Sequence, residues 1–334
     1  MLAWLLGCFI ESPQALGMTG DATDNELPFL KGMTISCQTW GLEWQTPEMA
    51  KTLDELKSLG VNSVAIHPYA QIRDDGHVSF RVIDDNRHIT VPLDWARERG
   101  LSVMLIPHIA YWGSRFSWRG EIDFKTKGEW DRFFADYAVW IVQMARIAQA
   151  HHVAVFCVGL EFTHAQKFED RWRAIIAAVR EVYGGKVTYG ANWNEYAEVK
   201  FWDALDYIGV LAYFPLTKSA NPSAEAIRTG WETRLGELEQ FSRAHGGKRF
   251  LFTEIGYNCS ARAAAEPFAF KMGGEHADEI QARCIDVALS LLPSHPFLAG
   301  MYWWKWFPEL PNREEEDFCV QTPVIKALIA RRWR

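Results

Sequence analysis

The sequence predicts a single (β/α)8 barrel. After residue 30, eight short apolar runs alternate with stretches of helical periodicity. Each run is nearly continuously apolar, which is typical of a parallel strand that is buried on both faces. The count of eight strands and the length of 334 residues favour a closed barrel over an open doubly wound sheet.

The predicted elements follow one another in regular order. The strands are expected at Gly32–Ser36, Ser63–His67, Ser102–His108, Ala154–Glu161, Val187–Asn192, Tyr207–Tyr213, Phe250–Glu254 and Ala299–Trp304. The helices are expected at Thr46–Leu59, Asp84–Arg99, Lys127–His151, Ala165–Tyr183, Ala224–His245, Glu275–Leu292 and Ile325–Arg332. The first helix begins at a capping threonine followed by proline and ends before Gly60. No boundary interrupts the pattern, so residues 31–334 are predicted to form one domain.

The first 30 residues differ from this pattern. Residues 1–10 are apolar, lack Lys and Arg, and are too few to span a bilayer. The run Leu5-Leu6-Gly7-Cys8 resembles the end of a bacterial lipoprotein signal. We interpret residues 1–30 as the remnant of an export or lipoprotein signal and a linker; a frayed apolar tail is the alternative. The interpretation predicts an exported protein that is periplasmic, extracellular or lipid-anchored. A cytoplasmic location is the alternative.

The composition excludes several classes of function. A net charge of -7 argues against binding to nucleic acid or to an anionic membrane. The six cysteines form no CxxC pair, and neither GxGxxG nor GxxxxGK[ST] is present, so zinc and nucleotide sites are not indicated. Sixteen tryptophans are many for this length and suggest rings that stack on flat ligands such as sugars.

The predicted strands end in polar and aromatic residues, although their bodies are apolar. Carboxyl-terminal strand ends line the active site of such barrels. The ends considered as substrate contacts are Trp40, His67, His108, Trp112, Asn192, Trp193, Tyr213, Trp303 and Trp304. We expect these side chains to surround one binding site.

Two glutamates close the fourth and seventh strands. Glu161 ends the run VAVFCVGLE and Glu254 ends RFLFTE. A carboxylate at the end of a buried strand is unfavourable without a partner or a function. Either glutamate alone could cap the following helix or pair with an arginine, but two among aromatic residues match the carboxylate pair that cleaves glycosidic bonds.

Strand parity is expected to turn both glutamates into the barrel. Side chains alternate between the two faces of a strand. If Glu161 points inward, Gly159, Cys157 and Val155 share its face. If Glu254 points inward, Phe252 and Phe250 share its face.

The strand positions suggest separate chemical roles. Glu161 is expected to be the acid/base, with Leu160 and Phe162 favouring its protonated form by desolvation. Glu254 is expected to be the nucleophile, kept ionised by a hydrogen bond from Tyr213. Trp303 or Trp304 would form an apolar floor beneath the sugar.

His67, His108 and Asn192 have competing interpretations. The histidines could bind a metal, but no third ligand is evident and the first strand, MTISCQTWG, lacks an HxH motif. They could instead hydrogen-bond the substrate or be structural. Asn192 and Asn194 could contact sugar hydroxyls or make turns.

Residues 31–307 resemble glycoside hydrolase family 113, a clan A (β/α)8 family of β-mannanases. The similar stretches are KGMTISCQTWG, SVAIHPYAQ, IPHIAYWG with SWRGEI, FCVGLEF, FTEIGY and MYWWKWF. The resemblance implies a retaining mechanism with Glu161 as acid/base and Glu254 as nucleophile. Most clan members have Asn where this chain has Leu160 and Arg where it has His67, so the usual contacts to the sugar 2-hydroxyl are unassigned. That hydroxyl is axial in a mannoside, which makes other contacts reasonable.

The sequence therefore predicts a retaining β-glycoside hydrolase for β-1,4-mannan or a related oligo- or polysaccharide, without cofactor or metal. We expect a monomer with no nucleic-acid partner, and no membrane contact beyond an N-terminal lipid anchor. A β-glycosidase for another β-linked glycan, a non-catalytic carbohydrate-binding barrel and a metal-dependent barrel hydrolase are the alternatives.

Overall fold

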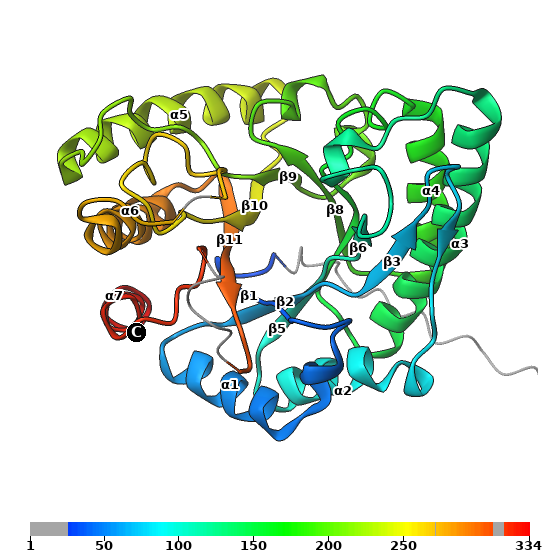
Figure 1. The fold of residues 1–334 in the computed structure, drawn as a ribbon, viewed down its shortest axis with the longest axis horizontal. Coiled ribbons are helices and arrows are strands. Elements are labelled where there is room, and N and C mark those ends of the chain that lie inside the picture. The colour runs from blue at the N-terminus through cyan, green and yellow to red at the C-terminus, as the bar shows by residue number, and fades with distance from the viewer. Residues whose placement is uncertain (1–25, 271, 310–316) are drawn as a thin grey trace, which may run out of the picture.

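The computed structural model describes residues 26–270, 272–309 and 317–334. Eight parallel strands close into a barrel in the order β1-β11-β10-β9-β8-β7-β5-β2, which confirms the predicted fold (Figure 1). The barrel strands are β1 Leu30–Ile35, β2 Ser63–Ile66, β5 Ser102–Leu105, β7 Val155–Leu160, β8 Lys186–Asn192, β9 Ile208–Leu211, β10 Phe250–Ile255 and β11 Leu298–Trp306. The apolar segment predicted at residues 1–10 lies outside the described residues.

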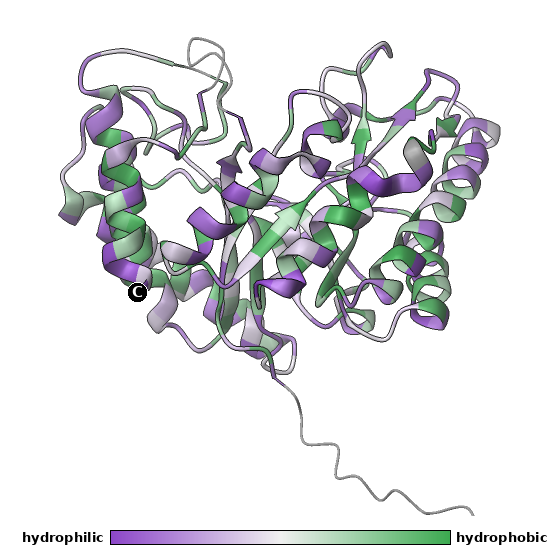
Figure 2. Ribbon diagram, turned by 90° about the horizontal axis from the view of Figure 1, so that it is seen from below, coloured by the Kyte–Doolittle hydropathy of each residue, from purple (hydrophilic) through white to green (hydrophobic). Residues whose placement is uncertain are grey.

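Seven α-helices in the described residues surround the barrel, as Figure 1 shows. They are α1 Pro47–Ser58, α2 Arg87–Glu98, α3 Lys127–Ala150, α4 Glu169–Val182, α5 Ala224–Ala244, α6 Ala277–Leu291 and α7 Pro323–Trp333. Helix α3 begins at a capping box in which Thr126 and Glu129 bond each other's backbone N–H groups. Apolar residues concentrate along the central strands and on parts of the helices (Figure 2). Within the described ranges, no helix is long and apolar enough to cross a membrane.

The core consists of a barrel interior and an outer layer between strands and helices. Side chains from around the barrel, including Leu30, Met104, Cys157 and Leu251, pack together in the interior. The larger cluster fills the outer layer, where tryptophans such as Trp172 of α4 and Trp231 of α5 are fully buried. This two-layer packing fixes the strands whose ends carry the polar residues.

The parity prediction was wrong for the strand of Glu254. Phe250 and Phe252 contact Phe241 and Trp231 of α5, so they face the helices, while Leu251 joins the barrel interior. The register of β10 shifts by one residue against both neighbouring strands after Phe252. Because a bulge adds one unpaired residue, it reverses the alternation and lets Glu254 face the cavity.

The parity prediction was partly wrong for β7. Val155 and Cys157 do face the interior. A Cβ added to Gly159, however, would lie within 2.9 Å of Trp172 and Tyr189 in the outer layer. The register of β7 shifts between Cys157 and Leu160, and Leu160 returns to the interior. Glu161 follows this bulge with φ of 59°, a left-handed conformation that is uncommon for a residue with a side chain.

A small second sheet in the order β4-β3-β6 lies beside the barrel mouth. Its strands are β3 Tyr69–Ile72, β4 Val78–Ser79 and β6 His108–Ala110. The sequence prediction had assigned His67 and His108 to barrel strands. Pro68 and Pro107 separate β2 from β3 and β5 from β6. Since proline has no N–H for the ladder, the barrel pairing ends there and the chain continues in the second sheet.

Candidate active site

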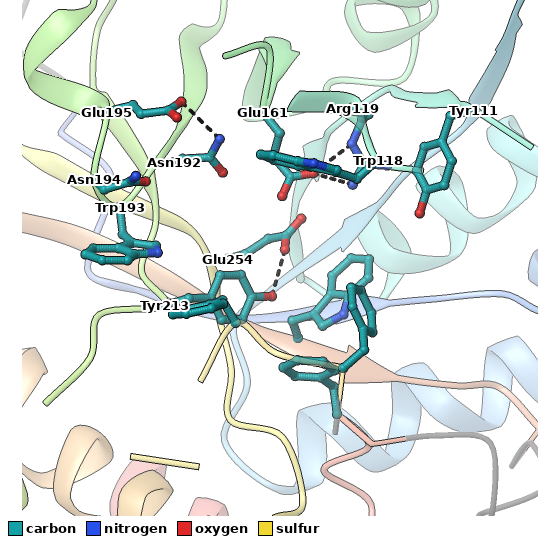
Figure 3. A pocket seen from close by; sticks show the side chains of 14 residues that line it. Tyr111, Trp118, Arg119, Glu161, Asn192, Trp193, Asn194, Glu195, Tyr213 and Glu254 are labelled. Carbon is teal, nitrogen blue, oxygen red and sulfur yellow. Dashed lines mark hydrogen bonds and ion pairs between the residues drawn. The ribbon is translucent and has the colours of Figure 1, made fainter. Parts of the chain in front are cut away.

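A cavity of about 480 Å³ opens at the carboxyl ends of the barrel strands (Figure 3). Its lining combines three carboxylates, one guanidinium, two amides and eight aromatic rings. These residues are Tyr111, Trp118, Arg119, Glu161, Asn192, Trp193, Asn194, Glu195, Tyr213, Glu254, Phe268, Phe270, Trp304 and Phe318. The structure thus brings both predicted catalytic glutamates into one aromatic-walled cavity.

Glu161 is held by Arg119. The guanidinium Nε donates to Glu161 Oε2 at 2.9 Å, and Nη2 lies 2.6 Å from the same oxygen. Arg119 begins a short 3-10 helix, Arg119–Glu121, in the segment before α3, within the stretch SWRGEI. Burial disfavours its charge, but the carboxylates of Glu161 and Glu254 raise the pKa of Arg119, so it remains a cation. The charge-assisted contact fixes the position of the Glu161 carboxyl group at the cavity wall.

Glu254 is the more deeply buried carboxyl, with 4% of its surface exposed. Tyr213 Oη donates a hydrogen bond of 2.8 Å to Glu254 Oε2, as the sequence analysis expected. Burial raises the pKa of Glu254 to about 8, and the charge of Glu161 adds to the increase. Arg119, Tyr213 and Lys305 act in the opposite direction. Desolvation therefore acts most strongly on Glu254, whereas the sequence analysis had expected it at Glu161.

Two predicted histidines lie behind the catalytic cavity and do not line it. His67 and His108 are fully buried and their rings stack with centroids 4.7 Å apart. His108 Nε2 lies 3.9 Å from Glu254 Oε1, beyond hydrogen-bond distance. Burial lowers the pKa of His67 to about 3 and holds that of His108 well below its usual value. Both rings are therefore neutral and support the cavity from beneath Trp304, whose ring centroid is 5.4 Å from that of His67.

Asn192, at the end of β8, belongs to a hydrogen-bonded cluster on the cavity wall. Its Nδ2 donates to Thr163 Oγ1 and to Glu195 Oε2, both at 3.2 Å. Thr163 Oγ1 in turn donates to Glu195 Oε2 at 2.8 Å. Because these contacts occupy the amide N–H groups, the carbonyl oxygen of Asn192 is the atom left to accept from a ligand.

Aromatic side chains form the remaining walls. Trp193 stacks on Phe268, with ring centroids 6.0 Å apart and an interplanar angle of 18°. Phe318 packs edge-on against Tyr213 on another side. Trp193, Tyr213 and Trp304 are among the substrate contacts predicted from the sequence. Arg119, Tyr111, Trp118, Glu195 and the three phenylalanines were missed because they come from loops, where no periodicity marks a functional position.

Besides the two histidines, three further predicted substrate contacts lie outside this cavity. Trp303 is 1% exposed and packs near Tyr257 in the outer layer, one residue away from the cavity-lining Trp304. Alternation along β11 explains why only one of the two tryptophans faces the cavity. Trp40 and Trp112 contact each other away from this cavity, and Trp40 lines a second, smaller cavity.

The described part of the chain contains no group of three or more His, Cys, Asp or Glu side chains arranged to hold a metal ion. What the cavity offers chemically is a pair of carboxyl groups in different environments. One is ion-paired and 17% exposed, and the other is buried and hydrogen-bonded to a tyrosine. Such a pair suits proton transfer combined with nucleophilic attack.

Comparisons with known proteins agree with this geometry. The family model of Glycoside Hydrolase Family 113 matches residues 33–321. The solved GH113 β-mannanase of Alicyclobacillus acidocaldarius, in complex with ManMIm, is 28% identical with a TM-score of 0.79, over 92% of this chain and 97% of that one. Two GH113 β-1,4-mannanase structures are 25% and 26% identical, with TM-scores of 0.80 and 0.78. They cover 92% and 91% of this chain, and 99% and 98% of their own.

The search of curated protein sequences finds no match. The family match nevertheless spans most of the chain and includes both strand-end glutamates. The chain is a glycoside hydrolase and belongs to glycoside hydrolase family 113.

Proposed function

We propose that the protein hydrolyses β-1,4-mannan or manno-oligosaccharides with retention, using Glu161 as acid/base and Glu254 as nucleophile. The observation that carries the proposal is that both carboxyl groups project into one aromatic-lined cavity (Figure 3). The family match and the three similar structures, each described as a β-mannanase, support the substrate class.

The chemistry proceeds by two displacements. Glu254 attacks the anomeric carbon, the bond to the leaving oxygen breaks, and Glu161 delivers its proton to that oxygen. The product of this step is a glycosyl ester on Glu254. Glu161, now a carboxylate, removes a proton from water, which attacks the anomeric carbon and releases the sugar and the Glu254 carboxylate. The second step restores the proton to Glu161.

Burial and the charge of Glu161 raise the pKa of Glu254 in the free enzyme. The nucleophile must be ionised when it attacks. We infer that groups that lower the pKa of Glu254, namely Arg119, Tyr213 and Lys305, are needed to keep it reactive.

The remaining wall groups suit a hexose. The ring of Trp304 offers an apolar floor for the C–H face of a sugar. The carbonyl oxygen of Asn192 and the carboxylate of Glu195 accept hydrogen bonds from hydroxyl groups. These acceptors take the place of the clan contacts that are missing at Leu160 and His67.

Paired variants test the roles. Glu254→Ala is expected to reduce mannan hydrolysis at least ~10⁴-fold. Glu161→Gln should slow the hydrolysis of mannan far more than the hydrolysis of an aryl mannoside whose leaving group needs no proton. Hydrolysis of mannan that is unchanged in Glu254→Ala, or equal losses of Glu161→Gln on both substrates, would contradict the assignment. Tyr183→Phe is the control, because Tyr183 Oη bonds Val153 O far from the cavity.

A further inference from the structure

The loop between β10 and α6 forms one wall of the catalytic cavity. It contributes Phe268 and Phe270, which are 47% and 82% exposed. Phe268 stacks on Trp193, with ring centroids 6.0 Å apart. In Figure 3, Trp193 and Arg119 lie on opposite sides of the two catalytic carboxyl groups. The position of the loop therefore sets the shape of the cavity on the side away from Arg119.

This wall is not built on regular secondary structure. Among residues 256–270 and 272–276, the backbone forms turns, and one isolated bridge joins Ser260 to Gly273. Backbone groups that are not paired in a helix or a sheet need other partners. The contacts that hold the loop must therefore come in part from side chains.

Asn258 supplies such contacts from the beginning of the loop, where it is fully buried. Its Nδ2 donates to the backbone oxygens of Glu266 and Ala269, at 2.8 and 2.7 Å. Its Oδ1 accepts a hydrogen bond of 2.5 Å from Ser260 Oγ. An amide side chain has two N–H donors and one oxygen, so Asn258 directs all of its polar atoms to this loop.

The partners of Asn258 lie on both sides of the wall residue Phe268. Glu266 precedes it by two positions and Ala269 follows it directly. Two hydrogen bonds from one buried amide thus hold the backbone on either side of the ring that meets Trp193. Fixing the backbone in this way fixes where the Phe268 side chain can reach.

Asn258 is itself attached to the barrel's outer layer. Gln281 of α6 donates from Nε2 to the backbone oxygen of the preceding residue, Tyr257, at 2.8 Å. The Tyr257 hydroxyl accepts from Nε1 of Trp231 in α5 at 3.0 Å. Both helices therefore hold the segment from which Asn258 projects, and the loop is tied to a rigid part of the molecule.

We propose that Asn258 is a positioning residue of the glycosidase, which fixes the loop so that Phe268 meets Trp193 and this wall is preformed for the glycan. Asn258 does not line the cavity, so it acts through the loop and not by touching the substrate. A preformed wall spares the substrate the entropy of ordering it. The inference rests on the proposed function, which supplies the glycan that the wall contacts.

A double-mutant cycle tests whether Asn258 acts through Phe268. Asn258→Ala and Phe268→Ala are each expected to lower kcat/KM on manno-oligosaccharides about tenfold. The loss should appear mainly in KM, because a loose wall weakens the binding of substrate and transition state alike. Since both changes remove the same wall, the double variant should also lose only about tenfold, whereas independent effects would multiply to about a hundredfold.

Asn62→Ala is the matched control. Asn62 also bonds two backbone groups, donating from Nδ2 to Phe29 O and accepting from Lys31 N, but it precedes β2 at the amino end of the barrel. Its loss should leave kcat/KM at the wild-type value. Combined with Phe268→Ala, it should add nothing to the loss caused by Phe268→Ala alone.

Limited proteolysis reads the loop directly, without any substrate. Chymotrypsin cleavage of the native protein after Phe268 or Phe270, located by mass spectrometry, should be about tenfold faster in Asn258→Ala, because cleavage follows the population of the opened loop. Asn62→Ala should be cleaved there at the wild-type rate. If Asn258→Ala does not fold, Ser260→Ala, which removes one bond of the same cluster, takes its place in both experiments.

Three results would overturn the proposal: kcat/KM in Asn258→Ala equal to that of Asn62→Ala, a double variant impaired about a hundredfold, or loop cleavage at the wild-type rate. Each of them leaves the proposed function standing as long as the wild type cleaves mannan. A wild-type enzyme that cleaves no manno-oligosaccharide would overturn the proposed function instead, and the proteolysis comparison would still decide whether Asn258 holds the loop.

Discussion

Arg119 is paired with Glu161, at 2.6 Å between Nη2 and Oε2, while Glu254 depends on a single hydrogen bond from Tyr213. The two carboxyl groups therefore share one cavity but have different partners. Because of this asymmetry, burial raises the pKa of Glu254 while Arg119 and Tyr213 lower it.

Replacing Arg119 should disturb both carboxyl groups. Arg119→Ala removes the cation that lowers the pKa of Glu254, so that pKa should rise further and kcat/KM on an aryl mannoside should fall ~10²-fold at neutral pH. Arg119→Lys keeps the positive charge but not the planar guanidinium group, so we expect its kcat/KM to lie between those of Arg119→Ala and the wild type. The measurement is kcat/KM against pH for the three enzymes. A rising limb at the same pH in Arg119→Ala and wild type would contradict the electrostatic role.

The substrate should determine the shape of the pH profile. Hydrolysis of mannan requires one proton on the carboxyl pair. That proton is lost as pH rises through the Glu254 pKa of about 8, so kcat/KM on mannan should fall above this pH. An activated aryl mannoside needs only ionised Glu254, so its kcat/KM should rise through the same pH and then level off. In Glu161→Gln the like charge is gone, and the rise should move to lower pH. The prediction fails if both substrates give the same profile.

Glu254→Gln should stabilise the protein at alkaline pH. The folded pKa of Glu254 lies above its unfolded value of 4.5, so the folded state binds more protons between these limits and wild-type stability declines as pH rises from 4.5 to about 8. A glutamine carries no charge to bury. We expect the variant to gain ~4 kcal/mol in free energy of unfolding at pH about 8.5, and little at pH about 4.5. Urea unfolding at both pH values measures the difference, and an equal gain at both would exclude ionisation as its cause.

Tyr213→Phe should weaken the nucleophile without removing it. The lost hydrogen bond lowers the pKa of Glu254 in the wild type, so the variant's pKa should rise and its rate of glycosyl-enzyme formation should fall about 10- to 100-fold. Pre-steady-state release of an aryl leaving group measures this rate. Tyr183→Phe loses a buried hydroxyl contact of the same length away from the cavity, and should change stability but not the pH profile.

The architecture could be predicted from the sequence because its signals are local. Continuous apolar runs mark buried parallel strands, and Thr46-Pro47 marks a helix start that the structure reproduces. The second sheet was missed because its strands have only two to four residues, too few for a strand pattern to be recognised, and because the third predicted strand runs through Pro107 to His108. The proline was the available signal, since it cannot donate to the barrel ladder.

The candidate site could be predicted only in part. Strand-end residues such as Glu161, Asn192, Tyr213 and Glu254 lie in the cavity, because a parallel barrel collects its strand ends. Arg119 and Phe270 reach it from loops, whose paths depend on tertiary packing. The orientations of Phe250 and Phe252 also escaped prediction, because alternation assumes an even ladder and bulges are not visible in the sequence.

The bulge in β10 has a consequence for protein engineering. A designer who transplanted Glu254 with its flanking residues onto the regular strand of another barrel would keep the sequence and lose the catalyst. Without the extra residue, the carboxylate would emerge beside Phe250 and Phe252, on the side covered by helices. The irregularity in the ladder is therefore part of what must be transferred, as much as the glutamate itself.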